Sequence, residues 1–249
     1  MTAPAAPWLR PVPFTRLAGV QLRIWRAHRF VAVAAVLSVA AGAGAAALGV
    51  GLPGGRLTGG VVAERFALAE ALYGLFWPVI GAVGAASAFT GGWAVLVLGV
   101  APRRGRWLLA ASATFLLVAA VATAAFVALG WLAVVLAGAG ADAAGAVPRR
   151  FLPVLGVTLL RAAAGFLLGA ALRNVAVALV LLYVVRWALP LLVVRSVDIG
   201  VWLDLDTATA ALATGDAGRH HGLPVVTALL LWIVVPAATA WARLRSSAQ

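Results

Sequence analysis

Two groups of charged side chains in this chain could carry chemistry. Arg161 and Arg186 stand inside long apolar runs, where a charge is costly and needs a partner or a polar cavity. The segment 195–222 holds carboxylates and imidazoles, which together are typical metal ligands: Asp198, Asp204, Asp206, Asp216, His220 and His221. Their spacing matches no metal-binding loop, so the sequence predicts no metal site.

The motifs of soluble catalysts are absent. The chain has no lysine and therefore no phosphate-binding GxxxxGK[ST] loop, and it has no cysteine, no HExxH and no GxSxG. The only histidine outside the segment 195–222 is His28, which is better explained as a polar group at a membrane surface than as a base. The sequence therefore predicts a protein that is not itself an enzyme and binds no cofactor.

Composition indicates a membrane protein. Hydrophobic residues make up 64% of the 249 residues and charged residues only 10%, against about 25% charged in soluble domains. The net charge of +12 is spread between apolar runs rather than gathered on one face, which argues against nucleic-acid binding. We expect an all-α, polytopic membrane protein with a single transmembrane domain over residues 1–249.

About 20 apolar residues cross a bilayer, and the uncharged runs predict six spans. The run from 71 to 102 is too long for one crossing, and Thr90-Gly91-Gly92 supplies a break because consecutive glycines weaken a helix. A cleaved signal peptide is the alternative for the first run, disfavoured by its length and by the 29 residues before it. The expected spans are 30–52, 71–89, 107–136, 151–172, 175–194 and 223–242.

The arginines predict the orientation. With both termini cytoplasmic, the inner segments contain eleven arginines and the outer segments six, as the positive-inside rule requires, and all seven acids are then outside. The inner set is Arg10, Arg16, Arg23, Arg26, Arg29, Arg103, Arg104, Arg106, Arg173, Arg243 and Arg245. Arg149-Arg150 is the one local exception. The expected location is a bacterial cytoplasmic membrane.

Residues 14–29 predict an interfacial amphipathic helix. Phe14, Leu17, Val20, Ile24 and Ala27 fall on one arc of a helical wheel, which we expect to lie in the bilayer boundary. The opposite arc carries the arginines that would meet lipid phosphates: Arg16, Arg23, Arg26 and Arg29. A basic targeting signal with a chance pattern is the alternative.

The intramembrane arginines leave two roles open. Arg161 fits either the lining of a pathway or a structural ion pair with Glu70 or Asp198, whereas Arg186 is close enough to the outer surface to snorkel. In the outer loop 195–222, the apolar stretches 199–205 and 208–213 predict short re-entrant helices, which must be buried in protein or line a cavity.

The ordered set of features resembles the permease subunit of type 2 ATP-binding-cassette exporters. In that family an amphipathic elbow helix precedes six spans, and an inner loop between spans two and three contacts the ATPase. Phe89, Gly92 and the sequence Pro102-Arg103-Arg104-Gly105-Arg106 match that loop, and GFLLGAALRN (residues 165–174) resembles the family's junction of spans four and five. Ala88 stands where the family has an acid, and Thr90 and Gly91 replace polar residues.

The resemblance implies an export permease for an amphiphilic substrate, such as a drug, lipid, peptide or glycan. It implies a second permease subunit and separate ATPase subunits that bind ATP and Mg²⁺. The implied coupling segment is 93–106, with contacts from Gly92, Trp93, Pro102, Arg103, Arg104 and Arg106. The rival is an ATPase-independent ion-coupled carrier or assembly factor. A carrier usually needs acids at the membrane midplane, and the sequence suggests none.

Overall fold

The computed structural model describes residues 13–51, 57–90, 104–185, 205–214 and 222–246. All regular secondary structure in these ranges is helical. Five helices are long and apolar enough to span a membrane, Arg29–Gly51, Gly59–Phe89, Gly105–Leu136, Ala141–Leu172 and Gly222–Ser246, and Val175–Val184 forms a shorter apolar helix. The described residues therefore have the all-helical architecture of a multi-pass membrane protein.

The chain begins with an amphipathic helix, α1 (Phe14–Ala27), followed after His28 by α2 (Arg29–Gly51). α1 packs mainly on α5. Its buried residues are Leu17, Gln21 and Trp25, while Phe14 and Val20 are 42% and 39% exposed. The face against the protein is thus rotated from the apolar arc expected in the bilayer boundary, and it includes a buried amide.

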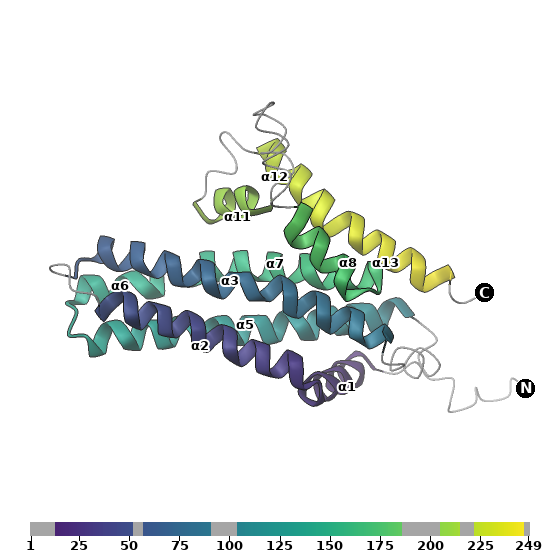
Figure 1. Cartoon of the computed structure of the whole chain (residues 1–249), viewed down its shortest axis with the longest axis horizontal. Helices are drawn as coiled ribbons and strands as arrows, with labels where there is room; N and C mark the ends of the chain where they lie inside the picture. Colours follow the sequence, from purple (N-terminus) through teal and green to yellow (C-terminus); the bar gives the residue numbers. More distant parts are fainter. Residues whose placement is uncertain (1–12, 52–56, 91–103, 186–204, 215–221, 247–249) are drawn as a thin grey trace, which may run out of the picture.

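Four long helices form the body of the molecule: α2, α3 (Gly59–Thr90), α5 (Arg104–Leu136) and α7 (Phe151–Leu172). They lie side by side along the long axis in Figure 1, with the short helix α6 (Ala141–Arg149) at one end and α1 at the other. The closest approach is between α3 and α7. A Cβ at Gly165 would lie 2.1 Å from the Pro78 carbonyl oxygen, and one at Gly169 would lie 2.4 Å from that of Ala82. Only glycine allows these backbones to meet, as at other membrane helix interfaces.

Aromatic rings fill the centre of the body. Tyr73 stacks on Phe126 with ring centroids 4.4 Å apart, and Phe115 stacks on Phe166 at 5.5 Å. The Tyr73 hydroxyl lies 2.9 Å from that of Thr123, which in turn donates to the Ala119 carbonyl. Each buried hydroxyl therefore has a partner, as burial in an apolar environment requires.

A second region covers one side of α3 and α7. It comprises α8 (Val175–Leu179), the π-helix η2 (Val180–Val185), α11 (Leu205–Thr214), α12 (Gly222–Leu229), the π-helix η4 (Leu230–Val234) and α13 (Val235–Ser246). Figure 1 shows these elements above the body, with α13 running back to the end where α1 lies. They share their own apolar cluster, which includes Leu182, Leu205 and Trp232 and reaches α3 and α7 through Ala82 and Leu168.

Three helix bounds differ from the sequence expectations. α3 begins at Gly59, twelve residues before the expected start, because Arg65 and Glu70 find partners inside the protein and do not end the helix. α5 begins at Arg104 rather than 107, so Gly105 and Arg106 belong to this helix. Residues 141–149, expected in a loop, form α6.

The turn between α7 and α8 does form where it was expected, at Arg173 and Asn174. Arg173 has a left-handed backbone with φ of 53°, and the Asn174 side chain accepts a hydrogen bond from the Val177 amide at 3.2 Å, which caps α8. The fifth expected span, 175–194, lies partly outside the described residues, and the coupling segment before Arg104 lies wholly outside them.

Candidate functional site

Most of the expected ATPase contact lies outside the described residues: Gly92, Trp93, Pro102 and Arg103. Arg104 is described only as the first residue of α5, and Arg106 follows half-buried in its first turn. Between these two arginines, Gly105 lies against the ring of Trp241 from α13, where a Cβ would sit 2.0 Å from the ring. The last helix therefore contacts the chain where the expected coupling segment ends.

The surface arginines of the first helix are placed as their types predict. Arg16, Arg23 and Arg26 are exposed on α1, and Arg29 is exposed at the start of α2. Asp142 is in the first turn of α6, at the opposite end of the body, and its carboxylate accepts a hydrogen bond from the Gly59 amide at the start of α3 (Figure 1). Arg149 at the end of α6 and Arg150 directly after it are basic, so this part of the chain carries charges of both signs.

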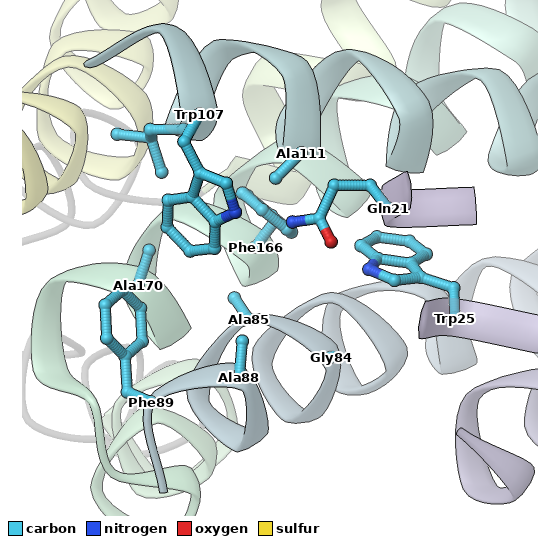
Figure 2. Close-up of a pocket in the computed structure, with 11 residues that line it drawn as sticks. Gln21, Trp25, Gly84, Ala85, Ala88, Phe89, Trp107, Ala111, Phe166 and Ala170 are labelled. Atoms are coloured by element: carbon cyan, nitrogen blue, oxygen red, sulfur yellow. The ribbon is translucent and has the colours of Figure 1, made fainter. Parts of the chain in front are cut away.

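A small pocket lies where α1 meets α3, α5 and α7. Figure 2 shows the Trp107 indole nitrogen directed toward the amide of Gln21, with Trp25 and Phe166 nearby and Phe89 beneath Trp107. The space is sufficient for about one water molecule. Trp107 and Gln21 are each 3% exposed, and the indole N–H of Trp107 has no hydrogen-bond acceptor among the described groups.

The pocket lining offers hydrogen bonds and no acid–base chemistry. Apart from Gln21 and the two indoles, it consists of apolar side chains and a glycine: Gly84, Ala85, Ala88, Phe89, Leu108, Ala111, Phe166 and Ala170. A buried N–H without an acceptor is unfavourable, and a water bound to Gln21 would satisfy it. The pocket therefore offers a site for one bound water between α1 and the beginning of α5.

A second polar site lies halfway along the body helices. Arg161 is the eleventh of the 22 residues of α7, and its Nη2 atom lies 2.9 Å from the Oδ1 atom of Asp206, in the first turn of α11. The two side chains are only 18% and 29% exposed. An arginine at the centre of a membrane costs about 2.5–3.5 kcal/mol on insertion scales, and a carboxylate partner offsets that cost.

α3 contains a proline at this same level. Pro78 has no N–H, so it cannot donate the helical hydrogen bond to the carbonyl of Gly74, four residues earlier. The Arg161 guanidinium lies beside Gly74, where a Cβ would come within 2.5 Å of Nη1. One residue further, the Tyr183 hydroxyl of η2 donates to the Leu75 carbonyl at 2.6 Å. Polar groups from α3, α7, η2 and α11 thus converge at mid-length, in what we call the mid-bundle polar site: Gly74, Leu75, Arg161, Tyr183 and Asp206.

The expected ion pairs of the intramembrane arginines need correction. Glu70 pairs with Arg150, through Arg150 Nε at 2.5 Å and Nη2 at 2.7 Å, and is not the partner of Arg161. Asp206, expected in an outer loop, is the partner instead. Arg186 and Asp198 lie outside the described residues. Arg150 was part of the local exception to the positive-inside rule. Its bidentate pair with Glu70 neutralises this charge.

Two residues at the level of the mid-bundle polar site carried a sequence signal that was not used. Tyr183 is one of only two tyrosines, and Pro78 interrupts a long uncharged run. Asp206 carried no such signal, because its position in a short helix against α7 depends on how the chain folds back. The described residues contain no group of three histidines or acids able to hold a metal. Asp198, Asp204, Asp216, His220 and His221 are not among them.

Comparisons with known proteins do not assign a family. No protein-family model matches the chain, and no curated protein matches it.

Proposed function

We propose that this chain is the membrane-spanning subunit of an exporter, and specifically the permease half of a type 2 ATP-binding-cassette system. Two such subunits, identical or different, would form a pathway for an amphiphilic substrate. Separate ATPase subunits would bind ATP and Mg²⁺ and supply the energy. The chain would lie in a bacterial cytoplasmic membrane with six spans and both termini inside.

The observation that carries this proposal is the mid-bundle polar site. Arg161 and Asp206 form an ion pair halfway along α7, beside the part of α3 that contains Pro78. Charges at such depth occur mainly where a membrane protein faces a cavity, a partner or a pathway. Transporters commonly place their substrate sites at this level, next to irregular helices.

The order of elements along the chain supports the exporter family. An amphipathic helix precedes the first apolar span, and a short helix, α11, precedes the last one. α3 ends at Thr90 and α5 begins at Arg104, so most of the coupling segment expected from the resemblance, 93–106, falls between these two helices. ATP-driven movement of that segment would push on the start of α5, which contacts α1 through the Trp107 pocket and α13 through Trp241.

Co-purification tests the ATPase partnership. The chain is expressed with the ATPase encoded by a neighbouring reading frame, and we expect the two to purify together. Arg103→Glu with Arg104→Glu should reduce ATPase recovery, while a C-terminal reporter still shows a cytoplasmic terminus. Arg23→Glu, on the exposed face of α1, is the control that changes a charge on the same side without touching the segment. A complex that transports normally after ATP depletion contradicts the proposal.

One observation favours a second candidate, an ion-coupled carrier. The sequence suggested no acid at mid-depth, but the structure brings Asp206 to the middle of α7. The second region also contains two π-helical segments, η2 and η4, which are frequent at functional sites. An intramembrane acid next to irregular helices is what a proton-coupled carrier uses.

Energy dependence separates the two candidates. Transport in everted vesicles should stop on ATP depletion and persist in the presence of an uncoupler if the exporter proposal holds. The reverse result, with transport lost on uncoupling and in Asp206→Asn, would identify a carrier.

A further inference from the structure

The guanidinium of Arg161 is held in a fixed position. It lies against Gly74, the one residue type that leaves room for it, since any Cβ there would come within 2.5 Å of Nη1. The position is anchored by the tight α3–α7 contact one turn further along at Gly165. Arg161 thus presents a planar set of N–H donors in a fixed position. Pro78 lies at the same level of α3 and has no backbone N–H of its own.

The anion that neutralises this guanidinium comes from a short element. Asp206 lies in the first turn of α11, a helix of ten residues that packs on α7 and α12, contributes Leu205, Ala208 and Ala211 to the apolar cluster there, and is too short to span a membrane. Its side chain remains 29% exposed and that of Arg161 18% exposed, so the pair is not fully enclosed. The pair formed by Arg150 differs because Glu70 belongs to the long helix α3.

A guanidinium at mid-bundle requires an anion at all times, but the anion need not be Asp206. Phosphate and carboxylate groups match the paired N–H donors of arginine as well as an aspartate does, and phosphate carries more charge. An amphiphile with an anionic headgroup could therefore replace Asp206 while its alkyl chain stays among apolar residues.

We propose that Arg161 is the headgroup-binding residue for an anionic amphiphile, and that the headgroup displaces Asp206 and releases α11 from α7. This inference deepens the proposed function, on which it rests for its physiological meaning, by naming the substrate class. Displacement also couples binding to movement, because α11 loses its ion pair with α7 only when the anion has arrived.

Binding of ³²P-labelled monododecyl phosphate to the purified chain in dodecyl maltoside tests the inference. We expect saturable binding to the unaltered protein. Asp206→Asn removes the competing carboxylate and should tighten binding by about tenfold. Arg161→Gln combined with Asp206→Asn leaves no unpaired charge and should abolish saturable binding, while size exclusion and circular dichroism show that this variant is folded.

Matched controls decide the outcome. Glu70→Gln disrupts the other ion pair and should leave binding unchanged. Unlabelled dodecyl phosphocholine should compete poorly, since its headgroup has no net charge. Competition by millimolar inorganic phosphate would assign the site to the free anion and overturn the amphiphile. Equal binding by the double variant and the unaltered protein would overturn the role of Arg161. The assay contains no ATPase, so either failure is distinct from failure of the exporter proposal.

Discussion

Two arginine–carboxylate pairs stand about 16 Å apart along the continuous direction of α6 and α7, eleven residues apart in sequence. Arg150 meets Glu70 through two hydrogen bonds near one end of the body, and its side chain is 35% exposed. Arg161 meets Asp206 at mid-length. Arg161 is less exposed than Arg150, at 18% against 35%, but Asp206 is more exposed than Glu70, at 29% against 16%. The two pairs therefore differ in position rather than in overall exposure.

The carboxylates of the two pairs belong to different kinds of element. Glu70 belongs to α3, which packs along most of α7, so the Arg150 pair joins two helices that are already fixed. Asp206 belongs to the short helix α11, in a region that also contains both described π-helical segments. The Arg150 pair therefore lies between helices that pack along their length, whereas the Arg161 pair links a short helix of the second region to α7.

Removing one partner at mid-bundle should have the largest effect on stability. Arg161→Gln leaves the Asp206 carboxylate without its cation, and we expect a loss of about 3 kcal/mol in the free energy of unfolding. Unfolding in mixed SDS and dodecyl maltoside micelles, followed by circular dichroism, measures it. The variant with Asp206→Asn added should recover most of the loss. Equal losses in the single and double variants would contradict the importance of the unpaired charge.

The second-largest loss of stability is expected from a change that separates α3 from α7. Gly165→Ala places a Cβ against the Pro78 carbonyl, and overpacking of this kind costs about 2 kcal/mol. Gly156→Ala, on the same helix with no atom within 4 Å, is the matched control and should stabilise slightly, by less than about 1 kcal/mol.

The same variant sharpens the comparison between the two pairs. In the Gly165→Ala background, Arg161→Gln should cost less than in the unaltered protein, while the cost of Glu70→Gln should change less. Arg161 lies one turn from Gly165, whereas Arg150 lies about four turns away. An equal change in the cost of both substitutions would contradict the distinction between the two ion pairs.

Disrupting the pair at the end of the body should have a smaller effect that depends on salt. Glu70→Gln is expected to cost about 1 kcal/mol, since the pair is bidentate but partly exposed. Raising the salt concentration from about 0.05 M to about 0.5 M should reduce this cost. The unfolding assay at the two salt concentrations measures the reduction, and a salt-independent cost for Glu70→Gln would place the pair in a more enclosed setting.

The smallest effect is expected from the tyrosines. Tyr183→Phe removes the hydrogen bond to the Leu75 carbonyl, and Tyr73→Phe the one to Thr123; membrane hydrogen bonds contribute about 0.6 kcal/mol on average. Tyr183→Phe should also raise the exchange rate of α11 amides with deuterium, because it loosens the second region. Tyr73→Phe is buried in the body and should not.

The helices of the body were largely predictable because they follow hydropathy. The runs that begin near 30, 107, 151 and 223 all correspond to described helices. The start of α3 was missed because Arg65 and Glu70 look like surface charges in the sequence. Both are partnered, Arg65 with the Gly49 carbonyl at 2.7 Å and Glu70 with Arg150. A charge is tolerated in a helix when another element neutralises it, and that element lies far away in the chain.

The candidate site was predicted only in part. Arg161 was identified because an arginine in an apolar run is costly wherever the run lies. Its partner was not, since Glu70 and Asp198 were as plausible as Asp206 by charge alone. The choice depended on α11 folding back against α7, a contact 45 residues away in sequence.

Composition and hydropathy alone determined that this chain is a helical membrane protein and where most of its spans lie, because transfer of each apolar run from water depends only on local sequence. The tertiary structure decided which charges pair, how α1 is rotated, and that Gly74, Arg161, Tyr183 and Asp206 meet. Those contacts depend on distances between segments that the chain brings together only when α3 and α7 pack through their glycines.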